Sequence, residues 1–331
     1  MSAASAGNDH RLGANEAPPA IVSMFLGDEL GAIVEALIDD HDYTSAERVS
    51  MDLGVDVLPN FIKDNTDRNR TSPFAFTGNK FEFRSLGSAQ SISGPNVILN
   101  TAIADTLMKM ADELEGAEDM TTAVDALIRK TLSAHMRIIF NGNGYDQAWV
   151  EEAKRRGLLN LPTTVDALPY YVAPKNIALF ERQKVFTREE VESRYEIKME
   201  TYIKVIDIEA LSTIDISRHL ILPAAIAYAK DVAATINMKK SVAPELEAEA
   251  EKALLSNLTA QTNALYKATD RLEAVLKAGD EGADMLERAR YTRDKVITAM
   301  DEVRAAGDAL EGIVGKSYWP MPTYQDLLTS V

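Results

Sequence analysis

The residues from Lys80 to Arg84 alternate between polar and apolar side chains. In an extended strand this period of two places Lys80, Glu82 and Arg84 on one face, and Phe81 and Phe83 on the other. A carboxylate between two cations is a surface suited to anions and to a metal ion. The same pattern describes an ordinary antiparallel strand with a solvated charged face and a buried aromatic face. Spacing alone does not separate these two interpretations.

Further cations lie upstream of this strand. Arg68 and Arg70 flank Asn69, directly before a Thr-Ser-Pro turn at residues 71–73. The chain carries a net charge of -16, so an anionic substrate would need local arginines, which Arg11, Arg70 and Arg84 could supply.

Composition limits the classes of function. A chain of 331 residues with 46% hydrophobic content can bury a substantial core and suggests about two domain-sized units. The negative net charge argues against a nucleic-acid partner or an anionic membrane partner. There is no cysteine, which rules out a disulfide framework and a thiolate site. Residues 1–7 lack the features of a signal peptide, and the longest apolar run, residues 220–227, is too short to span a membrane, so we predict a soluble protein.

The first third of the chain is predicted to contain loops and short elements. Residues 1–19 are rich in Gly, Asn and Pro and predict a mobile loop, and residues 21–25 predict a short buried strand. Asp28 is expected to cap a helix with an apolar stripe. His41 lies among Asp39, Asp40 and Asp42, where a solvated acidic loop is favoured over a metal site because adjacent loop carboxylates lack fixed geometry.

Helices are predicted over residues 91–115, 120–140 and 146–157, followed by a loop through Pro162 and Pro169. His135 lies on the apolar stripe of the second helix and is expected to be a core histidine. Thr187 and Glu190 form a capping box at the start of a further helix.

From Leu211 onward the pattern is almost wholly helical. Leu258, Leu265 and Leu272 recur every seven residues, and a matching apolar series follows a glycine-containing break at residues 279–282. We predict an antiparallel helical hairpin with a narrow seam, which could be plain packing or a contact with another subunit. The predicted domains are residues 1–210 and 211–331.

Three segments, residues 7–20, 68–84 and 319–324, resemble glutamine synthetases, and their amino-acid sequences are similar to those of the type III branch of that family. The resemblance implies an α+β fold: the C-terminal part of a catalytic domain with antiparallel active-site strands and packed helices, then a mainly helical extension with the hairpin. It also implies a cytoplasmic enzyme assembled as a homo-oligomeric ring, with ATP and Mg²⁺ or Mn²⁺ as cofactors.

The resemblance also implies roles for individual residues. In the family, ATP phosphorylates the side-chain carboxylate of glutamate, and ammonia attacks the resulting γ-glutamyl phosphate. The resemblance implies that Glu16 lies on a flap over the ammonia pocket and that Arg11 and Arg84 contact glutamate. It implies that Arg70 contacts the phosphate that is transferred and that Lys80 contacts the nucleotide. Glu82 is implied to bind a metal ion.

The sequence departs from the better-known type I pattern in three places. Arg11 and Glu16 are one residue closer, Lys80 replaces an arginine, and residues 72–75 contain no arginine. These differences affect the reach of the flap and the way in which the nucleotide is held.

The remaining metal ligands of the family would precede Gly7. We therefore expect an incomplete catalyst that makes no glutamine alone, although the N-terminus does not show whether Met1 is a true start. Two other functions stay open: a non-catalytic structural or regulatory relative, and a glutamate ligase that uses another amine.

Overall fold

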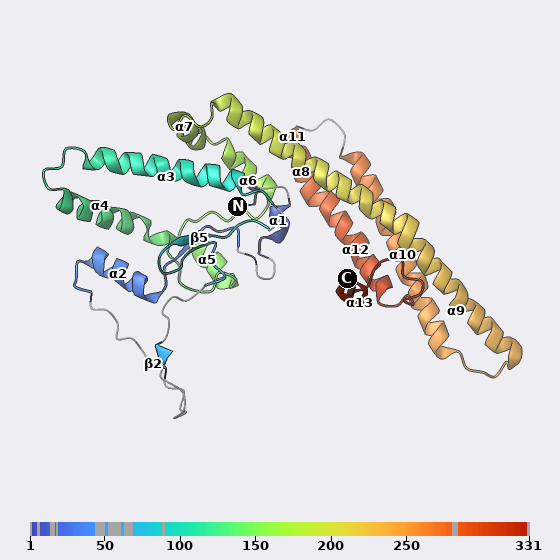
Figure 1. The fold of residues 1–331 in the computed structure, drawn as a ribbon. Coiled ribbons are helices and arrows are strands. Elements are labelled where there is room, and N and C mark those ends of the chain that lie inside the picture. The colour runs from blue at the N-terminus through green and yellow to red at the C-terminus, as the bar shows by residue number, and fades with distance from the viewer. Residues whose placement is uncertain are drawn as a thin grey trace. The chain divides into compact units, whose positions relative to one another are not determined.

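The computed structural model describes residues 2–4, 7–13, 17, 19–43, 50–51, 61–62, 69–87, 90–279 and 284–329 (Figure 1). The chain divides into two compact units, Met1–Lys198 and Met199–Val331. We call them the first and the second unit and describe each by itself.

The first unit contains a small mixed sheet. Strands β1 (Met24–Phe25), β4 (Phe74–Phe76) and β5 (Phe81–Phe83) lie in the order β1-β4-β5. β1 is parallel to β4, and β4 is antiparallel to β5. β2 (Ser50–Met51) and β3 (Phe61–Ile62) form a separate antiparallel pair. The predicted antiparallel pairing of the active-site strands holds for β4 and β5, but β1 is parallel to β4, so the sheet is mixed.

Two local predictions near the N-terminus are also corrected. The predicted loop contains a short helix, α1 (Asn8–Arg11). Helix α2 (Asp28–Asp39) forms as predicted, but its N-cap is Gly27, at φ 80, and the end has no side-chain cap hydrogen bond. Asp28 is instead the first helical residue, where its carboxylate interacts favourably with the helix dipole.

Helices α3 (Ser93–Leu114) and α4 (Met120–His135) form a hairpin, and Asp119 caps α4 by accepting hydrogen bonds from the Thr121 and Thr122 amides (Figure 1). The prediction of a core histidine is wrong, because His135 is exposed. It ends α4 where the chain passes into η1 (Met136–Ile138), and Leu127 is the buried residue of the helix.

Helix α5 (Gln147–Arg155) carries the buried Trp149, which packs with Ile21 and Ala153. The predicted loop beyond it contains α6 (Thr164–Tyr171), in which Pro169 lies, and α7 (Pro174–Arg182) follows. A Thr163 cap and the burial of Leu168 favour α6 despite the proline.

An ion pair of a buried carboxylate with an exposed arginine joins α3 to α7. The Nε atom of Arg182 donates to Asp105 Oδ1 at 2.6 Å, and Lys109 Nζ lies 2.8 Å from Asp105 Oδ2. These cations, Arg182 first, hold the pKa of Asp105 well below its usual range. Asp105 is 4% exposed, so it fixes α7 against α3 inside the unit.

Helix α8 (Arg188–Ile216) begins in the first unit and runs into the second. The predicted capping box before it is confirmed, since the Thr187 amide donates to Glu190 Oε2 at 2.9 Å and the Glu190 amide donates to Thr187 Oγ1 at 3.3 Å. The predicted boundary at Ala210 falls inside α8 and stays a prediction.

The second unit is a helical bundle. After α8 come the π-helix η2 (Ser217–Ile221), α9 (Leu222–Val242) and α10 (Glu249–Ala278). Helix α11 (Met285–Tyr291), the π-helix η3 (Thr292–Val296), α12 (Ile297–Glu311) and α13 (Tyr324–Thr329) complete it.

Helix α10 packs against α9 and α12, which confirms the predicted hairpin. Leu258, Leu265 and Leu272 are each 0% exposed. The seam is thus closed within this chain, and these leucines are not available to another subunit.

One helix among the described residues, Arg188–Val242, is long and apolar enough to cross a membrane by length and composition. Met199 and Ala210 in α8 and Ala225 in α9 are fully buried within the protein. We therefore interpret this segment as a core helix.

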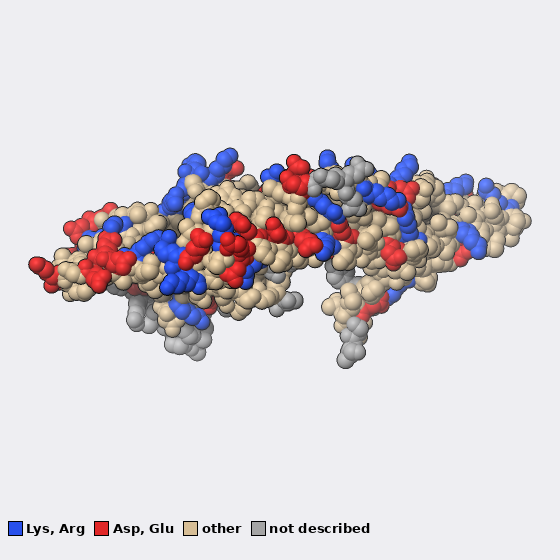
Figure 2. Space-filling view, turned by 90° about the horizontal axis from the view of Figure 1, so that it is seen from above, with Lys and Arg blue, Asp and Glu red and all other residues tan. Residues whose placement is uncertain are grey.

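Figure 2 shows Lys and Arg mixed with Asp and Glu over much of one face, with acidic side chains gathered at the end where α3 and α4 meet. On this face acidic side chains therefore lie among basic ones over much of the surface and are concentrated at that end.

Candidate functional site

Lys80, Glu82 and Arg84 share one face of β5, as the alternation predicts. Lys80 Nζ lies 3.6 Å from Glu82 Oε1, and Arg84 Nη2 lies 3.0 Å from Glu82 Oε2. The side chain of Arg84 is 23% exposed and that of Glu82 is 31% exposed. One carboxylate is therefore placed between two cations at a surface that solvent reaches.

A tight hairpin sets the register of this face. The Thr77 amide donates to the Lys80 carbonyl at 2.8 Å, and Gly78 takes φ 88 at the first central position of the turn. That conformation favours glycine and suits a two-residue hairpin. It places Ala75 opposite Glu82, so the acidic residue stands at the centre of the β4–β5 ladder.

The opposite face of β5 is less buried than predicted. Phe81 is 45% exposed and stacks on Phe74, with ring centroids 5.6 Å apart. Phe76 and Phe83 complete the aromatic group. The prediction of a buried face is wrong for Phe81, because within the described sheet β5 is an edge strand and its aromatic rings pack mainly on one another.

Asn69 connects Arg84 to the segment before β4. Arg84 Nη1 donates to the Asn69 carbonyl at 2.5 Å. The side-chain oxygen of Asn69 accepts from the Thr71 amide at 2.9 Å and from Thr71 Oγ1 at 2.6 Å, while its Nδ2 donates to the Gly142 carbonyl at 2.9 Å. The Arg84 guanidinium is thus supported by an ordered turn.

Residues 141–145, which we call the 141–145 loop, hold this turn. The Gly144 amide donates to Thr71 Oγ1 at 2.7 Å, and the Tyr145 hydroxyl lies 3.5 Å from the Arg70 carbonyl. A Cβ atom on Gly144 would collide with the Thr71 carbonyl. The loop and the turn are therefore in close backbone contact.

Arg11 approaches the same region from the N-terminal segment. Its Nη1 donates to the Ser85 carbonyl at 3.2 Å, one residue beyond Arg84. The segment is fixed by Asp9 Oδ2, which accepts from the Thr164 amide at 2.9 Å, and by Lys198 Nζ, which donates to the Ala3 carbonyl at 3.3 Å. Burial lowers the pKa of Lys198. The side chain of Arg11, one predicted substrate residue, is therefore bonded to the backbone directly after Arg84, the other.

The remaining predicted residues are placed less closely. Arg70 is exposed, and its backbone, through the Tyr145 hydroxyl, belongs to the same turn. Glu16 and Arg68 lie outside the described residues. Residues 319–324 belong to the second unit and are far along the chain from the strand.

Comparison with known proteins gives a consistent result. A family model described as the glutamine synthetase C-terminal domain matches residues 123–240. The chain is 42% identical over 337 residues to a type-3 glutamine synthetase of Dictyostelium discoideum, covering 99% of this chain and 45% of that protein. It is 40% identical to a glutamine synthetase of Butyrivibrio fibrisolvens, covering 100% of this chain and 47% of that protein. A third relative, a glutamine synthetase of Bacteroides fragilis (strain YCH46), is 32% identical over 98% of this chain and 46% of its own length.

The chain is a glutamine synthetase homologue. It spans less than half the length of the curated relatives it matches. Its likeness to glutamine synthetases extends over almost the whole of its own length, including both units.

The described residues of this homologue do not fit a divalent metal ion. Within them, no group of three or more His, Asp or Glu side chains could hold one. Both oxygens of Glu82 face cations, which would repel a metal ion, whereas carboxylate-rich sites attract it. A metal-binding role of Glu82 would require ligands from outside the described part of the chain.

Sequence reasoning missed the residues that support the arginines. Asn69 was visible only as the residue between two arginines, and residues 141–144 were interpreted as a break between helices. The available signal was composition: Asn and Gly alternate at 141–144, which is typical of turns and loops. The partner of that loop could not be identified without the fold.

Proposed function

We propose that this chain is the C-terminal part of an enzyme that ligates ammonia to glutamate with ATP and forms glutamine through a γ-glutamyl phosphate. The observation that carries the proposal is the 42% identity to a type-3 glutamine synthetase over 99% of the chain. The cationic strand face agrees with it, because the reaction brings anionic glutamate and anionic ATP together.

In this proposal the arginines bind the anions. Arg84 and Arg11 contact the carboxylates of glutamate, since a guanidinium can form paired hydrogen bonds with a carboxylate. Their support is the placement of Arg11 against Ser85, next to Arg84. For Arg84 to take a glutamate carboxylate, the ligand would join or replace Glu82 as its partner.

Arg70 and Lys80 are proposed to contact the phosphates of ATP. Both side chains are exposed, and Lys80 is 65% exposed beside Glu82. Lys80 offers a point charge and not a fork, so we expect it to bind a phosphate oxygen without fixing its orientation. Glu16 is proposed as the flap that keeps water from the acyl phosphate. The divalent ion, when bound, would neutralise phosphate charge, and we assign no step to Glu82 through it.

We further propose a cytoplasmic homo-oligomer in which the second unit contributes to assembly. Its exposed apolar side chains, including Ile208, Leu211 and Ile226, support this proposal, since the leucine seam is already filled. Deleting residues 245–307 should change the oligomer mass in size-exclusion chromatography with light scattering. An unchanged mass with full activity would remove the assembly role.

The activity is tested with the intact protein as its gene encodes it. We expect ATP-dependent glutamine formation from glutamate and ammonium, measured by amino-acid chromatography, and a matched assay with methylamine or ethylamine tests the amine. Purification from a host that lacks its own glutamine synthetase excludes contamination. A second arm uses residues 1–331 alone, for which we expect no glutamine.

A non-catalytic relative is the alternative that one observation favours, namely the pairing of Glu82 with two cations. It predicts that the intact protein binds neither ATP nor glutamate and releases no phosphate with any amine, but still forms the oligomer. Glutamine formation by the intact protein would exclude it.

A further inference from the structure

The Asn69 side chain uses both of its polar atoms to order one turn. Its oxygen accepts two hydrogen bonds from Thr71, at 2.9 Å from the amide and 2.6 Å from the hydroxyl. Its nitrogen donates to the Gly142 carbonyl at 2.9 Å. The Asn69 carbonyl, which receives Arg84 Nη1 at 2.5 Å, is therefore held in a fixed orientation.

The hydroxyl of Thr71 connects this turn to the 141–145 loop. It donates to Asn69 Oδ1 at 2.6 Å and accepts from the Gly144 amide at 2.7 Å. Only a group that both donates and accepts can make this link, which a serine can replace and a valine cannot. Gly144 permits the close approach, since it has no Cβ to meet the Thr71 carbonyl.

The other end of the 141–145 loop is bonded to the chain beyond β1. Asn141 Oδ1 accepts from the Leu26 amide at 3.0 Å and from the Gly27 amide at 3.2 Å. The Phe140 amide donates to the Met24 carbonyl at 2.9 Å. β1 pairs with β4 and β4 with β5, so these hydrogen bonds connect the 141–145 loop through the sheet to β5, the strand directly before Arg84. Arg84 is thus held both by its place after β5 and by the turn that the 141–145 loop supports.

We propose that Asn69 and Thr71 are positioning residues, which hold the Arg84 guanidinium for a carboxylate ligand by tying its carbonyl support to the 141–145 loop. The inference rests on the proposed function for the identity of that ligand. The support itself is a property of the described contacts and can be measured without catalysis.

The kinetic test compares Thr71→Val with Thr71→Ser in the intact protein. Loss of the two partly buried hydrogen bonds of the Thr71 hydroxyl should raise the KM for glutamate by roughly five- to tenfold with kcat within about twofold, while Thr71→Ser stays within about twofold of wild type in both. Thr106→Val is the matched control, because its exposed hydroxyl donates to the Ala102 carbonyl of its own helix, at 2.9 Å. A merely structural role would lower the melting temperature of Thr71→Val without this division between KM and kcat.

A second measurement needs no activity. In ¹⁵N-labelled wild-type protein we expect the side-chain N–H signals of Arg84, assigned with Arg84→Lys, to exchange slowly with water. Thr71→Val should speed this exchange about tenfold or more, and Thr71→Ser should not. If Thr71→Val does not fold, Asn69→Asp replaces it, since it keeps the acceptor of Asn69 and loses the donor to Gly142.

The two arms separate the possible failures. Wild-type protein that forms no glutamine but shows the predicted Arg84 exchange would refute the proposed function and keep the positioning role. Unchanged Arg84 exchange in Thr71→Val, or equal damage by Thr71→Ser, would overturn the positioning role whatever the activity.

Discussion

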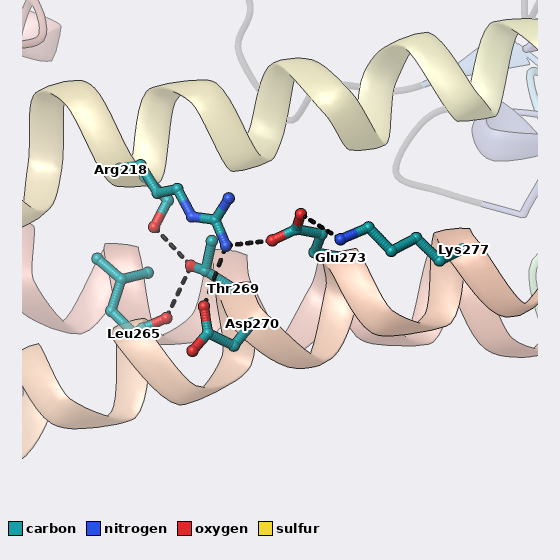
Figure 3. Close-up of polar contacts among 7 residues, drawn as sticks. Arg218, Leu265, Thr269, Asp270, Glu273 and Lys277 are labelled. Atoms are coloured by element: carbon teal, nitrogen blue, oxygen red, sulfur yellow. Dashed lines mark hydrogen bonds and ion pairs between the residues drawn. The ribbon is translucent and has the colours of Figure 1, made fainter.

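Arg84 in the first unit and Arg218 in the second are both partly exposed arginines that contact carboxylates, but their surroundings differ. Arg218 Nη2 lies 3.0 Å from Asp270 Oδ1 and also contacts Glu273, which Lys277 Nζ approaches to 2.8 Å (Figure 3). Two carboxylates there balance two cations. Among the described residues at β5, one carboxylate, that of Glu82, lies between the two cations Lys80 and Arg84, and Arg84 also donates to the Asn69 backbone carbonyl.

The difference in charge balance distinguishes contacts that stabilise the fold from contacts that can bind a ligand. Charges that are matched within one unit hold helices together and leave little attraction for a ligand. A cationic excess beside backbone support is costly in isolation and is relieved when an anion binds. The helical network is therefore interpreted as structural, whereas the strand face is the surface that we propose receives substrate.

The sharpest test of this division is Arg84→Ala. We expect kcat/KM for glutamate to fall about a thousandfold, because a charge-assisted paired contact is lost at the reacting substrate. Steady-state kinetics of the intact enzyme measure it. Arg218→Ala is the matched control and should keep kcat/KM within about twofold; an equal loss in both variants would end the distinction between the two regions.

Leu265→Ala should show the opposite behaviour. Leu265 is 0% exposed in the seam of α10, so truncation leaves a cavity and should lower the free energy of unfolding of the second unit by about 3 kcal/mol. Below the melting temperature, kcat should be unchanged. Urea denaturation followed by circular dichroism measures the effect, with Lys267→Ala, at an exposed position of the same helix, as the control that should change little.

Ser217→Ala tests the neutral polar contact in the same bundle. Ser217 Oγ and Thr269 Oγ1 are 2.6 Å apart and buried. Thr269 also donates to the Leu265 carbonyl at 2.8 Å, and Figure 3 shows these two residues. Since Thr269 keeps one partner, the loss should be about 1 kcal/mol of unfolding free energy. Ser241→Ala, at an exposed hydroxyl, should be near neutral. If Ser217→Ala lowered the free energy of unfolding as much as Leu265→Ala does, the hydroxyl pair would contribute more to stability than one hydrogen bond.

The smallest effect is expected in the acid dependence of the Arg218 network. Lys277 first, and then Arg218, lower the pKa of Glu273 to about 2. Since the unfolded group titrates near its ordinary value of about 4.3, the contribution to stability is complete above that pH and is lost as the pH falls toward 2. Glu273→Gln should lower the melting temperature at pH 7 by roughly 2 °C and make it less sensitive to acid between about pH 5 and pH 3. Thermal unfolding across this range decides it, and a melting temperature unaffected at pH 7 would assign the network no role in stability.

The helices were predictable where local rules act alone. The capping box at Thr187 and the heptad series of α10 both appear in the structure, because they depend on neighbours within one or two turns. His135 and Phe81 were mispredicted for a common reason. An apolar stripe or an aromatic face identifies a side that favours burial, but only the tertiary fold decides whether another element covers it.

The candidate site was predictable only in part. The shared face of Lys80, Glu82 and Arg84 follows from the strand period, while their proposed roles came from resemblance and remain predictions. The 141–145 loop lies far along the chain from the turn it supports, since Gly144 follows Thr71 by 73 residues. No pattern within either segment specifies such a pairing, because a loop hydrogen bond depends on where both backbones are brought by the sheet.

The π-helix η2 has a consequence for changes in chain length. A π-helical turn contains one residue more than an α-helical turn, so Ser217–Ile221 acts as an insertion within one continuous helix. Because the wider turn absorbs the extra residue, deleting a single residue there should let a regular α-helix run through while later residues keep nearly their orientation. A single deletion in the regular α-helical turns on either side would instead rotate all later residues by about 100°. The face of α9 that buries Ala225, Val232 and Ile236 would then turn away from its partners. The helix should therefore accept a one-residue deletion within Ser217–Ile221 more readily than in the α-helical turns beside it.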